Sequence, residues 1–289
     1  QADGEIFMKI GNREFDTAAH TYVMGILNVT PDSFSDGGKW NHMDAALKHT
    51  EQMIEEGASV IDVGGESTRP GYEPVSDEEE IARIAPMITH IKSRFDIPVS
   101  LDTYKSAVAE AGLRAGADMI NDIWGLRHDD NMARIIADSG AACCLMHNRD
   151  KAVDTGQVKN DKSCVDVSLF WESVLVDLSK SVRIAEEAGI ARDKIILDPG
   201  IGFGKTYEQN LQVLHDMGKL HTFGYPLLLG ASRKSVVGLT LDLPVNERLE
   251  GTLVTTVLAV MKRYSFVRVH DIKEHVRAIR MAEAVRDCV

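Results

Sequence analysis

The sequence predicts an α/β protein, a single-domain (β/α)8 barrel that takes up the whole chain, residues 1–289. Three observations lead to this fold class: eight short apolar runs rich in β-branched residues, amphipathic helical stretches between them, and regular alternation of the two. An open, doubly wound sheet is the alternative, but it usually has fewer units and carries a dinucleotide-binding loop. The count of eight therefore favours the closed barrel, which commonly needs about 250 residues.

Each predicted strand is nearly continuous in apolar character, as expected of a parallel strand buried on both faces. The runs are YVMGILNV from Tyr22, SVIDVG from Ser59, IPVSLD from Ile97, DMINDI from Asp118, AACCLMH from Ala141, KIILDPG from Lys194, PLLLGAS from Pro226 and SFVRVHD from Ser265. After the first run, apolar residues recur at helical spacing from Met43 until Gly57. Ser76 with Glu79 predicts a capping box for the next helix. Residues 1–7 are expected to be a disordered end or a remnant of cloning.

Composition narrows the function classes. With 44 acidic against 32 basic residues, the net charge of −12 argues against non-specific binding to nucleic acid or to acidic membranes. No apolar stretch approaches the ~18 residues of a membrane helix, and the first residues do not read as a signal peptide. The four cysteines lack zinc-site spacing, and Cys143 and Cys144 should point to opposite faces of one strand. We therefore expect free thiols, a cytoplasmic location and no nucleic-acid or membrane partner.

The most informative feature is the polar residue at the end of each apolar run, because the carboxyl ends of the strands form the active face of such a barrel. One such residue alone is often structural, but eight strands that deliver polar groups to one rim predict a site. The rim residues are Asn28, Asp62, Asp102, Asn121, Asp122, His147, Asp198, Ser232, Arg233, Lys234, Arg268 and His270.

Their chemistry suggests a planar heterocycle and an anionic leaving group. A buried carboxylate accepts two parallel N–H bonds from an amino-pyrimidine edge, so Asp102 and Asp198 with Asn121 suit such a ring. Lys234 could meet a ring nitrogen or carbonyl. Arginines fork across phosphate oxygens, which suits Arg69, Arg268 and their neighbour His270 to a phosphate or pyrophosphate. Asn28 offers an oxygen of the kind that magnesium accepts.

Three loops and one motif accompany the rim. Gly65–Ser76 and Leu27–Trp40 are expected to be lids, with ordinary surface loops as the alternative, and Asn148–Val167 is a long irregular segment. Pro199–Thr206, PGIGFGKT, nearly spells a phosphate-binding P-loop, but Pro199 replaces its first glycine. We expect instead that its glycines let the backbone pass close to a ligand, with Phe203 offering an aromatic face.

Seven segments in order resemble the dihydropteroate synthase family of pterin-binding enzymes, from about Met24 to Asp271. They are LNVTPDSFSDGG, IDVGGESTRPG, SLDTYK, NDIWG, LDPGIGFGKT, GASRKS and RVHD. The resemblance implies a barrel, usually homodimeric, that serves bacterial folate biosynthesis and is a target of sulfonamides. In that reaction p-aminobenzoate attacks the methylene carbon of 6-hydroxymethyl-7,8-dihydropterin pyrophosphate, and pyrophosphate leaves with the help of Mg²⁺.

The resemblance also assigns residues. It implies catalytic roles for Asp102, Lys234, Arg69, Arg268 and His270. The pterin set would be Asp102, Asn121, Ile123, Met146, Asp198 and Lys234. The pyrophosphate set would be Asn28, Arg69, Arg268 and His270, with Asn28 as the metal ligand. The p-aminobenzoate set would be Phe34, Thr68, Arg69, Pro70, Phe203 and Ser235. The bond to pyrophosphate breaks early in the family and leaves a pterin carbocation, which the Asp102 carboxylate suits.

The chain departs from the family pattern after LMH, where HNRDKAVDTGQVKND replaces a Gly-Pro-rich stretch, and before RVHD. The first loop has no extra residues that would suggest a sulfonamide-excluding pocket. A pterin-dependent methyltransferase is the enzyme alternative, but it does not use a pyrophosphate clamp. A silent pterin-binding paralogue, or a scaffold barrel, is the alternative from another class. Such a paralogue should have lost a clamp residue, and Asn28, Arg69, Lys234, Arg268 and His270 are all present.

Overall fold

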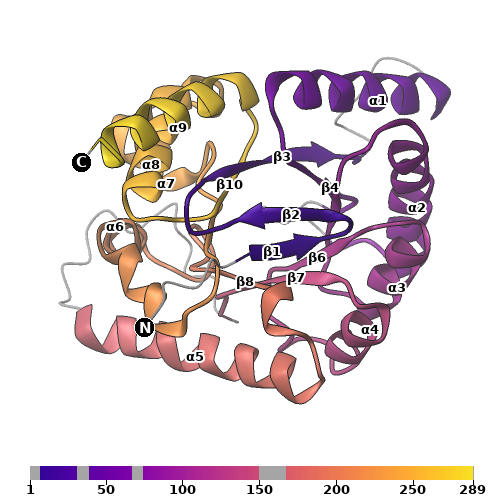
Figure 1. Ribbon diagram of the computed structural model, residues 1–289, viewed down its shortest axis with the longest axis horizontal. Coiled ribbons are helices and arrows are strands. Elements are labelled where there is room, and N and C mark those ends of the chain that lie inside the picture. Colours follow the sequence, from indigo (N-terminus) through magenta and orange to yellow (C-terminus); the bar gives the residue numbers. More distant parts are fainter. Residues whose placement is uncertain (1–6, 31–38, 67–73, 150–166, 289) are drawn as a thin grey trace.

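Eight parallel strands lie edge to edge in the order β8-β7-β6-β5-β4-β3-β10-β9 in the computed structural model, which describes residues 7–30, 39–66, 74–149 and 167–288 (Figure 1). A parallel bridge between Leu197 and Leu227 joins β8 to the chain just before β9. The Leu197 amide also donates to the Pro226 carbonyl at 3.0 Å. These contacts close the sheet, so the predicted (β/α)8 barrel is confirmed.

The strands are β1 (Phe7–Ile10), β2 (Arg13–Asp16), β3 (Tyr22–Asn28), β4 (Val60–Gly64), β5 (Val99–Asp102), β6 (Met119–Asp122), β7 (Ala142–Met146), β8 (Ile195–Asp198), β9 (Leu228–Leu229) and β10 (Phe266–Val269). The α-helices are α1 (Lys39–Glu56), α2 (Asp77–Arg94), α3 (Ser106–Arg114), α4 (Met132–Ser139), α5 (Val167–Glu187), α6 (Tyr207–Asp216), α7 (Ser235–Leu241), α8 (Leu249–Met261) and α9 (Ile272–Arg286). Short 3-10 helices span Arg192–Lys194, Met217–Phe223 and Val245–Glu247.

All eight predicted strands are present, as β3 to β10. The antiparallel hairpin β1–β2, in which Phe7 pairs with Asp16, was not among the predicted elements. Phe7 is thus a strand residue and not part of a disordered end, and residues 1–6 lie outside the described part. The hairpin was missed because its two strands, FMKI and REFD, have only four residues each and no continuous apolar run like those of the barrel strands.

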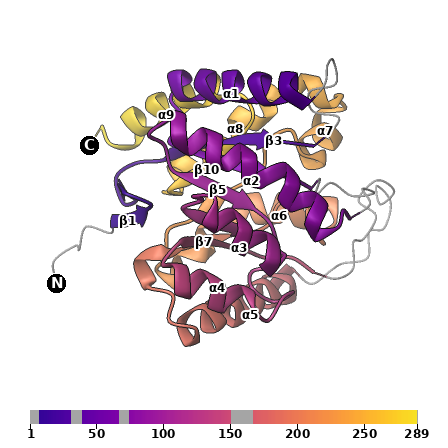
Figure 2. The same ribbon diagram turned by 90° about the vertical axis from the view of Figure 1, so that its right-hand side faces the viewer.

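The hairpin forms the floor of the barrel. Figure 1 shows it across the middle of the view, and Figure 2 shows β1 at one end of the barrel. Its apolar side chains Met8, Ile10 and Phe15 share one buried cluster with the inward-facing residues that start the barrel strands. Those residues are Met24, Val60, Met119, Ala142, Cys144, Ile196, Leu228 and Phe266. The amino end of the barrel is therefore filled with apolar side chains.

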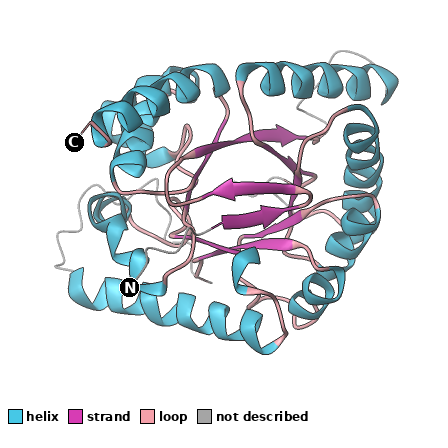
Figure 3. Ribbon diagram, in the orientation of Figure 1, coloured by secondary structure: helices cyan, strands magenta, loops and turns pink. Residues whose placement is uncertain are grey.

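The opposite strand faces pack against the helices, which surround the barrel in Figure 3. Val23, Ile61 and Ile120, each next in sequence to an inward residue, belong to the second and larger apolar cluster with the helices. Because side chains two apart on a strand share a face, this alternation tells which later residues point inward. Cys143 and Cys144 obey it, since they fall in different clusters as predicted.

The predicted end of one helix is confirmed, and the predicted capping box of another forms only in part. The first predicted helix, α1, ends before Gly57, whose φ of +107° is readily adopted by glycine. At Ser76 only half of the predicted capping box forms: its side chain accepts from the Glu79 amide, whereas the Glu79 carboxylate contacts Arg83. The reciprocal box is found at Thr206, at the start of α6. No helix in the described ranges is both long and apolar enough to cross a membrane.

Candidate active site

The carboxyl-end half of the barrel interior is polar. Two or four residues beyond the apolar floor, the inward positions hold Asn28, Asp62, Asp102, Asn121, Asp198 and Arg268. Each follows its strand's inward parity, as Asp62 follows Val60 and Arg268 follows Phe266. The inward side chains are thus apolar at the floor, the amino end of the barrel, and polar at the carboxyl end, which we call the mouth. The candidate site lies at the mouth.

Arg268 of β10 reaches across the barrel to two carboxylates. Its Nε donates to Asp62 Oδ2 at 2.6 Å, and its Nη2 donates to Asp102 Oδ2 at 2.9 Å. The Asn121 amide donates to the same Asp62 oxygen at 3.3 Å. The second oxygen of each carboxylate, Oδ1, is buried and has no hydrogen-bond partner among the described residues. Two acceptor atoms are therefore available to a ligand that presents N–H groups.

Burial and charge make these groups unusual acids. Burial, together with the nearby charge of Asp62, raises the pKa of Asp102 to about 7, although Arg268 opposes the shift. Burial works to lower the pKa of Arg268, but Asp62 and Asp102 outweigh it and raise that pKa above its usual value. The guanidinium therefore stays charged, while Asp102 can gain or lose a proton near neutral pH.

Asp198 and Lys234 form the second part of the site. Asp198 ends β8, and its Oδ1 accepts a hydrogen bond of 2.7 Å from the Gly200 amide. Lys234 donates to the Ile201 carbonyl, and its Nζ lies 4.5 Å from the centre of the Phe203 ring. Burial lowers the pKa of Lys234 to about 8, against the attraction of Asp198. Burial likewise raises the pKa of Asp198.

Glycines bring the backbone close to these charges. A Cβ at Gly230 would lie 3.6 Å from Asp198 Oδ2 and 3.9 Å from Lys234 Nζ. A Cβ at Gly64 would lie 3.6 Å from Asn28 Oδ1 and 3.7 Å from the Asp102 Cβ. Asn28 and Asp102 therefore flank the same strand end, and Asp198 and Lys234 flank another.

His270 lies at the rim beside Ser232, with 2.9 Å between its Nδ1 and the Ser232 hydroxyl. The same hydroxyl accepts from the His270 amide at 3.2 Å. The adjacent Arg233 has a φ of +55° and forms a two-bond ion pair with Asp271, at 2.5 and 3.1 Å. These contacts join the β9–α7 segment to the end of β10.

The remaining predicted residues divide into two groups. Ile123 and Met146 are buried directly after β6 and at the end of β7, and Phe203 and Ser235 are partly exposed in the β8–α6 loop and at the start of α7. Phe34, Thr68, Arg69 and Pro70 lie outside the described residues. The structure brings the described pterin set to one mouth, and the roles of its members remain predictions.

The two ends of the segment that carries Thr68, Arg69 and Pro70 are fastened together. Glu66 before it accepts from Lys105 Nζ at 2.6 Å, and Val75 after it accepts from the same nitrogen at 2.7 Å. Glu80 of α2 adds a third acceptor at 2.8 Å. Lys105 of the SLDTYK motif therefore holds the base of this segment beside β5.

Two of the predicted rim residues face away from the mouth. Asp122 and His147 have the parity of Ile120 and Leu145, which pack against the helices. Both Asp122 oxygens accept backbone amides of the following turn, from Trp124 at 2.8 Å and Leu126 at 2.7 Å. The prediction that all rim residues serve one site is wrong for these two, because strand parity turns them outward.

Sequence reasoning gave no role to Asp62 and Lys205. Asp62 is fully buried and accepts from both Arg268 and Asn121. A signal for it was present, since a carboxylate within an apolar strand needs a partner when buried. Lys205 is also fully buried, and it contacts His147 on the outer side of the barrel.

The described residues hold no cluster of three or more His, Cys, Asp or Glu side chains that could bind a metal alone. Magnesium often takes only one or two protein oxygens and keeps its waters or binds substrate phosphates. The carboxamide oxygen of Asn28, at the mouth beside Asp102, fits that kind of site.

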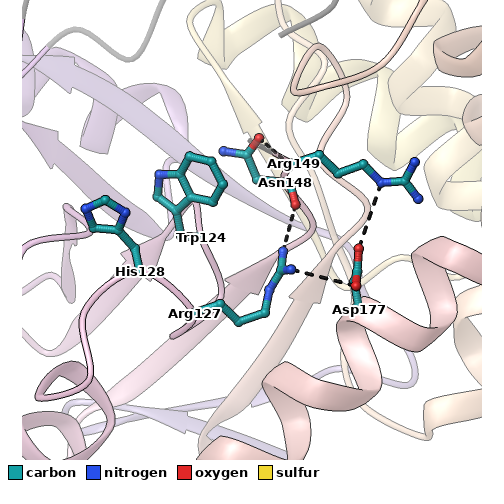
Figure 4. A pocket seen from close by; sticks show the side chains of 6 residues that line it. All are labelled: Trp124, Arg127, His128, Asn148, Arg149 and Asp177. Atoms are coloured by element: carbon teal, nitrogen blue, oxygen red, sulfur yellow. Dashed lines mark hydrogen bonds and ion pairs between the residues drawn. The ribbon is translucent and has the colours of Figure 1, made fainter. Parts of the chain in front are cut away.

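A second concave region lies outside the mouth, between α5 and the loops that follow β6 and β7. Figure 4 shows this cavity of 290 Å³, in which Asp177 lies between two arginines. Asp177 Oδ1 is 3.8 Å from Arg127 Nη1, and Asp177 Oδ2 is 3.8 Å from Arg149 Nε. Trp124, His128 and Asn148 complete the lining. None of the residues predicted for the site lies here.

Comparison with known proteins agrees with this geometry. The family model described as "Pterin binding enzyme" matches residues 24–270. A dihydropteroate synthase of Clostridium beijerinckii is 55% identical over 279 residues, 96% of this chain and 99% of the relative. A crystal structure of dihydropteroate synthase from Clostridium difficile in the presence of pteroic acid shares 48% identity with a TM-score of 0.86, over 94% of this chain and 98% of that one. The Yersinia pestis enzyme in a sulfonamide drug complex shares 39% identity with a TM-score of 0.86, over 98% and 100% of the two chains. The chain therefore belongs to the dihydropteroate synthase family of pterin-binding enzymes.

Proposed function

We propose that this chain is a transferase that condenses 6-hydroxymethyl-7,8-dihydropterin pyrophosphate with p-aminobenzoate to give 7,8-dihydropteroate and pyrophosphate. The observation that carries the proposal is the set of buried acceptors at the mouth, Asp102, Asp198 and Asn121, which matches the N–H edge of a pterin. Family membership and the pteroic acid found with a relative support the same reaction.

The charges at the mouth suit a reaction in which the bond to pyrophosphate breaks before the amine attacks. A pterin carbocation carries positive charge, and the buried carboxylate of Asp102 stabilises it more strongly than water would. Arg268 uses Nε and Nη2 for Asp62 and Asp102. We therefore assign its Nη1 to the leaving pyrophosphate, together with His270 and with Arg69, which lies outside the described residues. The attacking nitrogen comes from p-aminobenzoate, so no protein nucleophile is required.

Magnesium is the proposed cofactor, with Asn28 as its protein ligand. When bound, the ion would neutralise charge on the departing pyrophosphate. Asn28 and Arg268 lie on the neighbouring strands β3 and β10, so a phosphate chain can meet the metal ligand and the guanidinium together.

We also propose that the chain acts as a homodimer through α8. Its exposed side includes Val254 (60% exposed), Val257 (37%), Leu258 (41%) and Met261 (45%), which recur every three or four residues as one apolar stripe. Such a stripe is unusual on a monomer surface and suits a second copy of the same helix. Light scattering should give a dimer for the native chain and a monomer for Val254→Glu/Leu258→Glu.

Phe203 and Ser235, with Phe34, Thr68 and Pro70, are the proposed p-aminobenzoate contacts. A sulfonamide resembles p-aminobenzoate in shape and charge, and the sulfonamide complex of the Yersinia pestis relative supports competition at this position. We further propose a cytoplasmic location, which the free buried thiols of Cys143 and Cys144 support.

The decisive experiment measures pyrophosphate release by the purified protein with pterin pyrophosphate and Mg²⁺, with and without p-aminobenzoate. Release that depends on p-aminobenzoate, with dihydropteroate as the product, is the expected result. Tight pterin binding without release would instead identify a silent pterin-binding protein. Asp102→Ala and Lys234→Ala serve as inactive controls that should still fold.

A further inference from the structure

Lys205 is a fully buried amino group that the proposed chemistry does not use. Its Nζ makes hydrogen bonds to the Gly200 carbonyl (2.7 Å), the Phe203 carbonyl (3.0 Å) and His147 Nδ1 (2.9 Å), with the His147 carbonyl at 3.5 Å. The residue is the lysine of the PGIGFGKT segment, where a P-loop lysine would face a phosphate. Here it is turned into the protein and binds backbone, which explains why the segment only resembles a P-loop.

The partners of Lys205 form a chain across three elements. His147 follows β7, and its Nε2 is buried and without a hydrogen-bond partner among the described residues; Asp177 Oδ2 of α5 lies 3.5 Å away. Asp177 is the carboxylate between the two arginines in Figure 4. A carboxylate on this side favours a proton on Nε2, which leaves Nδ1 as an acceptor. Lys205 Nζ thus lies within hydrogen-bond distance of three acceptors, although burial lowers the pKa of Lys205 well below its ordinary value.

The β8–α6 loop, residues 199–206, is packed tightly against His147 and Arg149. A Cβ at Gly200, whose φ is +72°, would overlap the His147 carbonyl oxygen, and a Cβ at Gly204 would lie 2.9 Å from the Arg149 Cβ. The loop carries Phe203, whose ring contacts Lys234. An apolar side chain in place of Lys205 would leave the buried Gly200 carbonyl and the partly buried Phe203 carbonyl without this donor.

We propose that Lys205 is a positioning residue for the p-aminobenzoate side of the site, because it fastens the loop that places Phe203 against Lys234. The proposal rests on the proposed function. It predicts that replacing Lys205 raises the KM for p-aminobenzoate more than the KM for pterin pyrophosphate. Asp198 is fixed independently of Lys205, because it pairs with Met146 in the sheet and its carbonyl accepts from the His147 amide at 2.9 Å. Phe203 lies five residues further along, beyond the sheet, and depends more on the loop contacts.

The test compares Lys205→Met with Thr256→Val in steady-state kinetics and thermal unfolding. Thr256→Val is the control because it removes one buried hydrogen bond of 2.9 Å, to His275 between α8 and α9, away from the mouth. For Lys205→Met we expect the KM for p-aminobenzoate to rise on the order of tenfold, and the KM for pterin pyrophosphate to stay within about twofold. Thr256→Val should lower Tm without changing either KM. Equal increases in both KM values, or a lower Tm alone for Lys205→Met, would overturn the proposal.

Two further measurements test the role of Lys205 even if the chain does not turn over substrate or Lys205→Met does not fold. Calorimetric Kd values for pteroic acid and for 6-hydroxymethylpterin need no turnover, and Lys205→Met should weaken pteroic acid more. A wild-type chain that makes no dihydropteroate would refute the proposed function, whereas equal Kd changes for both ligands would refute the role of Lys205. If Lys205→Met does not fold, His147→Leu should raise the KM for p-aminobenzoate and His147→Asn, which keeps an acceptor near Nδ1, should not. No difference between these two variants would also refute it.

Discussion

Replacing Arg268 with methionine should make the stability of the barrel depend strongly on pH. In the native chain the guanidinium lies 2.6 Å from Asp62 and 2.9 Å from Asp102, and both carboxylates are buried. Methionine keeps much of the side-chain volume but leaves two negative charges without a cation. Breaking a buried ion pair in this way costs about 3–5 kcal/mol in the free energy of unfolding, and we expect that loss at pH 8.

The sign of the pH dependence follows from the pKa values in the folded state. Without Arg268 the pKa of Asp102, already raised to about 7 by burial, rises further, because the guanidinium no longer opposes the effect of burial. In the unfolded chain the Asp102 carboxyl titrates at about 3.9. The folded variant thus binds protons that the unfolded chain does not, so its stability falls as pH rises through this window. At pH 5 we expect a loss of only about 1–2 kcal/mol, from the missing hydrogen bonds.

Urea unfolding followed by circular dichroism at pH 5 and pH 8 measures the difference. Arg248→Met is the matched control, because Arg248 donates to the Leu243 and Arg233 carbonyls and its loss should matter equally at both pH values. Adding Asp62→Asn to Arg268→Met should recover much of the stability at pH 8. A loss for Arg268→Met that is the same at pH 5 and pH 8 would refute the reasoning.

Three other predictions concern titration, capping and thiol access. The kcat/KM profile should be bell-shaped, falling below about pH 7 as Asp102 gains a proton and above about pH 8 as Lys234 loses one; a flat profile from pH 6 to 9 would contradict the assignment. Thr206→Val removes the capping box of α6 and should cost about 1 kcal/mol in urea unfolding, without changing the fold by circular dichroism. Cys143 and Cys144, whose pKa values burial raises, should resist a thiol reagent until denaturant is added, as peptide mass mapping would show; labelling of the native chain at either residue would contradict their burial.

Much of the barrel could be predicted because its strands obey a simple rule. All eight apolar runs became strands, since a parallel strand buried on both faces must be apolar throughout. The hairpin β1–β2 could not be recognised in the same way, because its packing is with strand starts scattered along the chain. The residue pattern of a short segment does not reveal contacts with residues that are distant in the sequence.

The site was predictable in its residue types but not in its pairings. The sequence placed Asp102, Asn121, Asp198 and Arg268 at strand ends, and the structure brings them to one mouth. It did not reveal that Arg268 turns inward to Asp62, because that contact depends on register across the barrel. Asp122 and His147 were predicted to face the mouth, but they face the helices. Their place at a strand end does not tell which side of the strand they are on; that depends on which residues of the strand face the barrel interior.

The hairpin floor also has a consequence for the order in which the molecule can be completed. Phe15 is synthesised well before Phe266, yet the centres of their two rings lie 5.5 Å apart, with Phe266 on β10. The hairpin therefore cannot complete this packing until β10 has been synthesised. Its strands are short, and half of their residues are charged (Lys9, Arg13, Glu14 and Asp16), which disfavours pairing with other strands during that interval. The floor of the barrel is thus completed only after β10 is available to pack against the hairpin.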